Sequence, residues 1–250
     1  MTRSRLIIAA AAVLVAIAVG GFVVYDQVLR GDSAAALTLP TASAAPAGST
    51  ATRTSGAPAA SAGSSATAGD VAGTWTVAAD SVAGYRVREQ LANLPAESDA
   101  VGRTDKVTGS ITVETSGSAT ILTAASLSVD MTSLASDKAM RDNRLRREGL
   151  ETDAFPTATF TLTAPVEVPA AALTGTTSDI TLTGDLTVHG VTKSVQIPAK
   201  AQLVNGTIQV AGSLTFPLSD YSIVAPNIGG FVVSIADDGT LEFLVKFSKG

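Results

Sequence analysis

The sequence predicts a mainly β domain in which an antiparallel sheet curls around an apolar interior. In residues 180–197, two runs rich in β-branched side chains flank His189-Gly190, the pattern of a hairpin with a two-residue turn. Small residues such as Gly184 interrupt the arms, as in sheets that curl. Such a sheet either packs on a second sheet or closes on itself. We expect a closed barrel, and a sandwich is the alternative because periodicity fits both.

The composition excludes several classes of protein. Cysteine is absent and His189 is the only histidine, so disulfides, thiolate sites and histidine-rich metal sites are ruled out. We expect no cofactor. The net charge of −5 argues against a nucleic-acid-binding protein.

The amino-terminal part of the chain predicts a membrane tether. Residues 6–25 carry no charge, and a helix of that length spans about 30 Å, the thickness of a bilayer core. Arg3 and Arg5 precede it, so the amino terminus is expected in the cytoplasm and the rest outside. We therefore predict a cytoplasmic tip and single-pass anchor over residues 1–30. The alternative is a cleaved signal peptide and a secreted protein.

Residues 31–72 are rich in Ala, Ser, Thr and Pro and lack the large apolar side chains that would offset the entropy of ordering. They predict a disordered linker. The folded domain is expected to occupy residues 73–250.

Alternation of apolar and polar residues, punctuated by turn residues, predicts about eight to ten strands in this domain. They cover residues 74–77, 83–91, 107–114, 119–131, 157–162, 180–188, 191–197 with its continuation 199–204, 207–216, 231–236 and 241–247. Asn205-Gly206 is a strong tight-turn signal, and Asp237-Asp238-Gly239 predicts a further turn. Residues 94–105 and 219–230 are expected to be loops.

Residues 136–148, SDKAMRDNRLRRE, predict the one helix of the domain. Strand formers are absent there, Ser136 suits the N-cap, and Gly149 follows as a stop. A charged helix of this kind usually faces solvent. The alternative is that its basic residues meet lipid phosphates at a membrane surface or at the mouth of a pocket.

Short motifs occur in a set order through the domain. They are Gly73-Thr74-Trp75, Tyr85-Arg86-Val87, Val107-Thr108-Gly109, Val129-Asp130-Met131, Arg141-Asp142, Leu145-Arg146, Phe155-Pro156, Phe160 and residues 184–192, GDLTVHGVT. In this order they resemble the YceI-like family of exported, lipocalin-like barrels associated with polyisoprenoid binding. The resemblance implies an antiparallel barrel with an apolar channel beside the inserted helix. It also implies an isoprenoid ligand, such as a quinone precursor or polyprenol. Where many family members carry an early histidine, this chain has Arg88-Glu89-Gln90.

Candidate ligand contacts follow from the strands and the helix. The lumen candidates are the large apolar members of strands or strand ends: Tyr85, Val87, Phe160, Leu186, Val188, Phe216, Tyr221, Phe231 and Phe243. Arg141 and His189 are candidates for contact with a polar head group, although His189 is first of all a turn residue, because it precedes Gly190 where positive φ is needed. No nucleophile-elbow or phosphate-loop motif is present, so we expect no catalysis.

The frequent small residues predict a barrel that its own side chains do not fill. Voids destabilise a protein, whereas a lipid in the same space is stabilised by about 0.8 kcal/mol for each buried methylene. The sequence therefore predicts a membrane-tethered, extracytoplasmic carrier of an isoprenoid lipid. Two alternatives are a non-enzymatic surface module that binds a protein or cell-wall partner, and an accessory to a membrane redox protein that acts on quinones.

Overall fold

The computed structural model describes residues 33–40, 71–92, 97–226 and 232–250. The predicted anchor, most of the predicted linker and Phe231 lie outside the described residues. Within the described ranges, no helix combines the length and the apolar character needed to cross a membrane.

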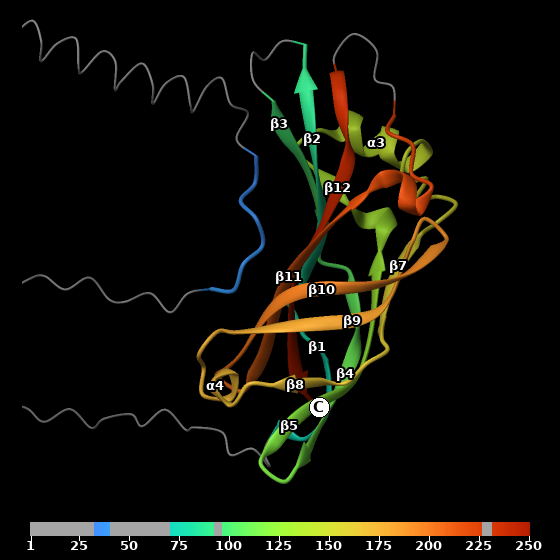
Figure 1. Ribbon diagram of the computed structural model, residues 1–250. Coiled ribbons are helices and arrows are strands. Elements are labelled where there is room, and N and C mark those ends of the chain that lie inside the picture. Colours follow the sequence, from blue (N-terminus) through green and yellow to red (C-terminus); the bar gives the residue numbers. More distant parts are fainter. Residues whose placement is uncertain (1–32, 41–70, 93–96, 227–231) are drawn as a thin grey trace, which may run out of the picture.

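The strands of the described residues form one antiparallel sheet that closes into a barrel (Figure 1). They are β1 (Gly73–Val77), β2 (Val82–Leu91), β3 (Ser98–Thr104), β4 (Val107–Ser116), β5 (Ala119–Asp130), β6 (Ala135–Ser136), β7 (Thr157–Leu162), β8 (Val166–Val168), β9 (Ser178–Val188), β10 (Val191–Val204), β11 (Thr207–Pro217) and β12 (Val232–Lys249). Pairing in the order β1-β4-β5-β7-β9-β10-β11-β12, with β12 returning to β1, gives a ring of eight strands. The predicted barrel is confirmed and the sandwich is not.

The long strand β12 is shared by two different partners, which divides the barrel into two halves. Its carboxyl-terminal part pairs with β1, where Phe247 lies opposite Val77. Its amino-terminal part pairs instead with β2, from Leu244 opposite Val82 to Val232 opposite Leu91, and β3 and β6 continue from β2. We call these the β1 half and the β2 half. The helix α3 (Ala139–Arg147) lies at the β2 half (Figure 1).

Large side chains fill the interior of the β1 half. Trp75 is 3% exposed, and Val245 and Phe247 are each 2% exposed. The indole N–H of Trp75 donates a hydrogen bond to the carbonyl of Val71 (2.8 Å), so the one polar atom of this ring is satisfied inside the core. The interior of this half is therefore filled by its own side chains.

Two of the hairpin turns match their sequence signals. His189 and Gly190 have φ of 51° and 73°, and Asn205 and Gly206 have φ of 51° and 72°. Positive φ at both central residues is the signature of the type I′ turn, whose twist suits the flanking strands. The turns predicted between β9 and β10 and between β10 and β11 are confirmed.

One predicted loop and one predicted turn belong to strands. Residues 98–104, expected to be a loop, form β3, and its Gly102 lies opposite Tyr85 of β2. A Cβ on Gly102 would lie 2.2 Å from the Tyr85 ring, so this glycine lets the ring lie across the backbone. Asp237-Asp238-Gly239 does not turn the chain either: it continues β12, and the register against β2 shifts between Ile235 and Gly239. The apparent turn is a bulge, which bends a strand without ending it.

The helix begins later than predicted. Lys138, not Ser136, is the N-cap of α3 and caps it with no side-chain hydrogen bond, while Ser136 belongs to β6 and donates its N–H to the Asp142 carboxylate (3.0 Å). A second short helix, α4 (Ala170–Leu173), and the 3-10 turns η1 (Met131–Ser133) and η2 (Leu218–Tyr221) were not predicted.

Residues 33–40 lie along the outside of the barrel, first beside β2 and β3 and then, at residues 37–39, beside β9, β10 and β11 (Figure 1, blue). The sequence predicted a disordered linker here, yet Leu39 is only 8% exposed. For these residues the structure differs from the prediction, because their backbone finds hydrogen-bond partners on the barrel surface.

Candidate ligand-binding pocket

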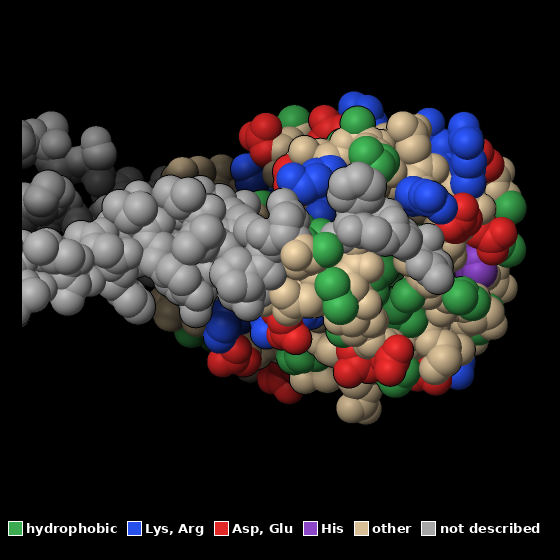
Figure 2. Space-filling view, turned by 90° about the horizontal axis from the view of Figure 1, so that it is seen from above, with side chains coloured by type: hydrophobic (Ala, Val, Ile, Leu, Met, Phe, Trp, Pro, Cys, Tyr) green, Lys and Arg blue, Asp and Glu red, His purple; other side chains and the backbone are tan. Residues whose placement is uncertain are grey.

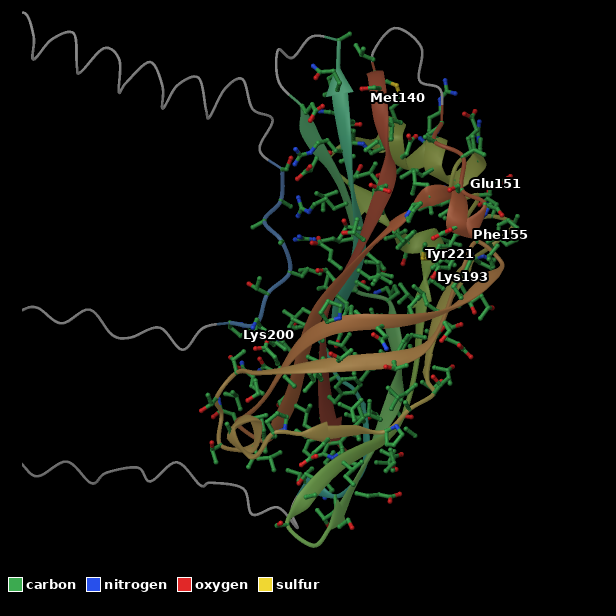
Figure 3. All side chains as sticks on the ribbon, viewed as in Figure 1. Met140, Glu151, Phe155, Lys193, Lys200 and Tyr221 are labelled. Atoms are coloured by element: carbon green, nitrogen blue, oxygen red, sulfur yellow. The ribbon has the colours of Figure 1, made fainter. Side chains whose placement is uncertain are left out.

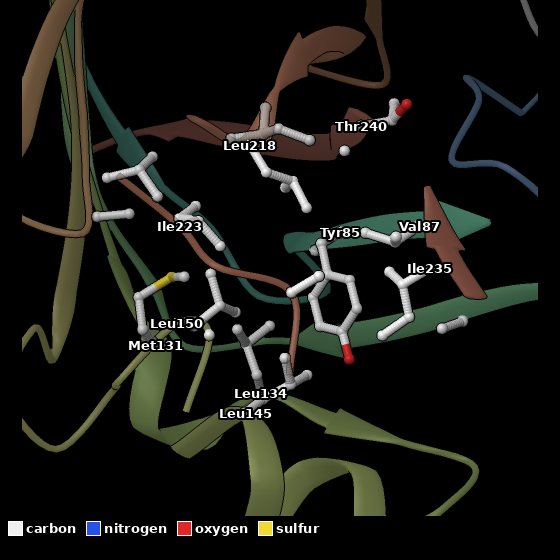
Figure 4. Close-up of a pocket in the computed structure, with 18 of the residues that line it drawn as sticks. Tyr85, Val87, Met131, Leu134, Leu145, Leu150, Leu218, Ile223, Ile235 and Thr240 are labelled. Carbon is white, nitrogen blue, oxygen red and sulfur yellow. The ribbon is translucent and has the colours of Figure 1, made fainter. Parts of the chain in front are cut away.

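An apolar pocket occupies the β2 half of the barrel. It lies between β2, β3 and β12 on one side and the ends of β5, β7 and β9 with α3 and its flanking loops on the other. Its wall includes Leu241, together with Val87, Met131, Leu134, Leu145, Leu150, Leu218, Ile223 and Ile235 (Figure 4). The space between the lining atoms is about 1070 Å³, including the part open to solvent.

Strand alternation and small side chains together produce this space. On β2, Tyr85 and Val87 face the pocket and the intervening Arg86 faces outward, as the period of a strand requires. Elsewhere the wall has alanine, at Ala100 of β3 and Ala158 of β7. The interior of the β1 half contains the large rings of Trp75 and Phe247. At Ala100 and Ala158 the wall of the β2 half carries only methyl groups, which leaves space between the strands.

One part of the pocket wall is polar and carries a buried ion pair. Glu89 of β2 is 4% exposed, and Nη2 of Arg141 on α3 donates a hydrogen bond to its Oε1. Nη1 of Arg141 donates to Asp137 and to Oγ of Ser136 (3.3 Å). Burial lowers the pKa of Arg141, but hydrogen bonds and charges from Asp137 and Glu89 outweigh it and raise that pKa. The positive charge of Arg141 is therefore matched by two carboxylates.

Tyr85 brings an unused hydrogen-bond donor to the pocket. Its hydroxyl is buried and has no partner among the described residues. Burial raises the pKa of Tyr85 well above its ordinary value, so the group is a neutral O–H donor at physiological pH. A buried hydroxyl without a protein partner is costly, and one that faces a pocket is available to a water molecule or to a polar atom of a ligand.

Five of the predicted contact residues line the pocket: Tyr85, Val87, Val188, Phe216 and Arg141. Phe160, Leu186, Tyr221, Phe243 and His189 do not line it, and Phe231 lies outside the described residues.

The apolar candidates outside the pocket are buried in the surrounding core. A Cβ on Gly184 would lie 2.5 Å from the Phe160 ring, so that ring packs flat on β9, with Leu186 directly opposite Phe160. Tyr221 packs behind Phe216, with ring centroids 4.7 Å apart.

His189 fixes two loops that carry pocket residues. Its Nδ1 is 3.0 Å from the carbonyl oxygen of Tyr221, its Nε2 is 2.9 Å from Oε2 of Glu151, and its ring lies 4.3 Å from that of Phe155. Glu151, Phe155 and Tyr221 lie at the same end of the barrel (Figure 3). Leu150 and Ile223 of the pocket wall lie close in sequence to Glu151 and Tyr221. His189 is thus placed to position the wall, and the structure does not bring it to the lumen.

Sequence reasoning missed the pocket residues that are not in strands. Leu134, Leu150 and Ile223 belong to connecting segments, and Leu145 belongs to the helix interpreted as a solvated face. Large apolar residues in segments predicted as loops were the available signal, because a loop that packs on nothing has no use for them. Within the described part of the chain, no three His, Cys, Asp or Glu side chains are grouped to hold a metal ion.

Comparison with known proteins agrees with this architecture. The model of the YceI-like domain matches residues 67–247. A polyisoprenoid binding domain from Saccharophagus degradans, implicated in plant cell wall breakdown, has 22% identity and a TM-score of 0.54, and the match covers 70% of this chain and 98% of that one. This likeness shows the same fold.

Two further solved structures resemble the chain more distantly. BcnA from Burkholderia cenocepacia has 19% identity and a TM-score of 0.49, over 66% of this chain and 95% of that one. The YCEI protein of Campylobacter jejuni has 18% identity and a TM-score of 0.45, over 60% and 85%. Among curated proteins, no match was found.

Proposed function

Because this chain belongs to the YceI-like domain family, we propose that it is a membrane-tethered, extracytoplasmic carrier that holds an isoprenoid lipid in the pocket of the β2 half without chemical turnover. The observation that carries this proposal is the apolar pocket itself, enclosed by β2, β3, β12 and α3. The polyisoprenoid binding domain from Saccharophagus degradans has the same fold, which supports a ligand of this class.

The energetics favour a long, flexible hydrocarbon. An empty cavity leaves its lining atoms without dispersion partners and destabilises the barrel. Each methylene transferred from water into the pocket contributes about 0.8 kcal/mol, so a few isoprene units supply several kcal/mol. The pocket wall offers no other recognition chemistry over most of its area, since most of its side chains are aliphatic.

The polar groups favour an uncharged head group that accepts a hydrogen bond. Tyr85 supplies one buried O–H donor. The charge of Arg141 is already paired with Glu89 and Asp137, so a phosphate or diphosphate would meet two carboxylates beside its one cation. An alcohol or a quinone carbonyl fits the donor without that repulsion.

The pocket end also presents apolar side chains to the outside. Met140 of α3, Val224 and Val233 are 66%, 76% and 68% exposed. Val224 directly precedes the pocket residues Ala225 and Pro226. Seen from this end, hydrophobic side chains are interspersed with charged ones (Figure 2). Together with the apolar segment 6–25, these side chains support an encounter with a bilayer from which the lipid enters.

The test is the lipid content of the native protein. The full chain is extracted in mild detergent, purified, and its bound lipids are identified by mass spectrometry; we expect about one prenyl lipid per chain. Ala158→Phe places a ring in the pocket and is expected to abolish that lipid. Ala124→Phe makes the same change at an exposed position of β5 and is the matched control. A lipid-free barrel without affinity for prenols contradicts the proposal, and capture of a wall polymer or envelope protein supports the surface-module alternative.

A further inference from the structure

We propose that residues 33–40 form a docked segment that shortens the tether and holds the pocket wall close to the membrane. The inference rests on the membrane anchor of the proposed function. The observation behind it does not depend on the pocket. The composition of residues 33–40 predicts disorder, yet these eight residues make hydrogen bonds to the barrel.

Most of the hydrogen bonds are made by backbone groups of the docked segment, which explains why the composition of its side chains did not predict them. Nη2 of Arg86 donates a hydrogen bond to the carbonyl of Ala34 (2.6 Å), and Nη2 of Arg103 donates to the carbonyl of Ala35. Further along, the N–H of Leu37 donates to Oε2 of Glu242 (3.4 Å). At its start, Oγ of Ser33 accepts from the N–H of Asp99 (3.0 Å).

The receptor on the barrel is a cluster of charges on its outer face. Glu242 of β12 lies between Arg86 and Arg103, with its carboxylate oxygens 3.6 Å and 2.8 Å from their Nη2 atoms. Arg86 also contacts Asp99 (3.0 Å). The two arginines and two carboxylates carry no net charge together. The guanidinium N–H groups also donate hydrogen bonds to carbonyls of the docked segment.

Burial of Glu242 is the strongest sign that the docked segment belongs to the fold. Its neighbours Leu241 and Phe243 face the interior, so Glu242 faces outward, yet it is only 2% exposed. An outward carboxylate on a strand is normally solvated. Here it is covered by two arginine side chains and the docked segment, and a buried charge is stable only when paired and hydrogen-bonded.

The receptor is also the back of the pocket wall. Arg86 alternates with the pocket residues Tyr85 and Val87 on β2, and Glu242 follows the pocket residue Leu241 on β12. The strands that bind the first part of the docked segment, β2, β3 and β12, are therefore also strands of the pocket wall. Their position relative to the membrane anchor is set by the chain that enters the docked segment.

The change in tether length is large. From Tyr25, the end of the predicted anchor, to Ser33 there are eight residues, with a contour of about 28 Å at most. Without docking the tether would extend to Gly73, about 48 residues. Effective concentration falls roughly as the −3/2 power of tether length, so docking raises the concentration of the barrel at the bilayer about 15-fold.

The experiment uses the full chain in vesicles of phosphatidylcholine and phosphatidylglycerol. Leu39→Asp places a charge at Leu39, the buried side chain of the docked segment. Thr38→Asp places the same charge at its exposed neighbour and is the control. Hydrogen exchange of a peptide that covers residues 33–40 reports docking. Because the chain has no cysteine, a dye on a single Lys106→Cys substitution, at an exposed site, reports by energy transfer the distance to labelled lipid.

We expect the N–H of Leu37, which donates to Glu242, to be protected from exchange in the wild type and in Thr38→Asp. Leu39→Asp should abolish protection, lower the energy transfer, and slow delivery of prenol from the vesicle to the barrel about 15-fold. An unprotected segment in the wild type overturns the inference, as does an unchanged distance in Leu39→Asp after protection is lost.

The affinity of the detergent-solubilised protein for a prenol tests the proposed function separately from the docking of residues 33–40. It should be equal in the wild type and Leu39→Asp, because neither variant site lines the pocket. A wild type that binds no prenol refutes the carrier, while protection and energy transfer still decide the docking.

Discussion

Replacing Tyr85 by phenylalanine should stabilise the empty barrel and weaken ligand binding at the same time. The hydroxyl of Tyr85 is buried without a partner among the described residues, and such a group typically costs about 1–3 kcal/mol. Tyr85→Phe removes the hydroxyl and keeps the ring that packs over Gly102. The free energy of unfolding of the lipid-free protein should therefore rise by about 1 kcal/mol or more.

The effect on binding has the opposite sign. A hydrogen bond between the hydroxyl and a ligand head group is worth about 0.5–1.5 kcal/mol net. Its loss should weaken the affinity for a prenol or a prenylated quinone about two- to twelvefold. A hydrocarbon of equal length with no polar head should bind both proteins equally, because it has no acceptor for Tyr85.

Tyr221→Phe is the matched control. Its hydroxyl is also buried without a partner in the described part of the chain, but Tyr221 does not line the pocket. It should stabilise the barrel with no change in affinity. Thermal unfolding measures the first effect, at about 2–4 °C for each kcal/mol in a domain of this size, and fluorescence titration with prenols measures the second. A lipid-free Tyr85→Phe barrel less stable than the wild type would refute the reasoning, because the hydroxyl must then have a partner within the protein.

Two further predictions concern the turns and the charges near the pocket. Gly190→Ala should lower the free energy of unfolding by more than Gly206→Ala. Both residues have φ near 72° and a strain of about 1–2 kcal/mol is expected at each, but only at position 190 would the new Cβ meet a ring, 2.7 Å from Cε1 of Phe155; equal losses in denaturant titrations would count against the Phe155 contact. Burial raises the pKa of Asp137, but hydrogen bonding and the charge of Arg141 outweigh it and lower that pKa. The stabilisation by Asp137 is therefore present above the ordinary carboxyl pKa, about 4, and is lost as the pH falls through the folded value. Asp137→Asn should flatten the acid side of the stability profile, and an unchanged slope between pH 5 and 2 would show that Asp137 is not linked to folding.

Local signals in the sequence predicted the features that depend on local geometry. His189-Gly190 and Asn205-Gly206 specify their turns because positive φ at two adjacent residues is tolerated by few side chains. The inward positions of Tyr85 and Val87 follow from the period of two in a strand, with no knowledge of the partner strand.

The same local rules failed where a distant strand decides the structure. Asp237-Asp238-Gly239 has the composition of a turn, but β11 pairs with β12 through Gly239 and keeps the chain extended. Residues 98–104 have weak strand propensity, and their pairing with β2 makes them β3. In both cases tertiary pairing overrides the intrinsic preference of the segment.

Taken by itself, the sequence determined the β class, the positions of the two type I′ turns, the face on which residues of the predicted strands lie, and the family. Only the tertiary structure decided which inward residues border open space. Phe160 and Tyr85 have the same inward parity, but Phe160 packs on Gly184 while Tyr85 faces the pocket. The physical reason is that periodicity reports a side chain's face and not its depth along the barrel. That depth is set by β12, which pairs with β1 over a filled core and with β2 over a hollow one.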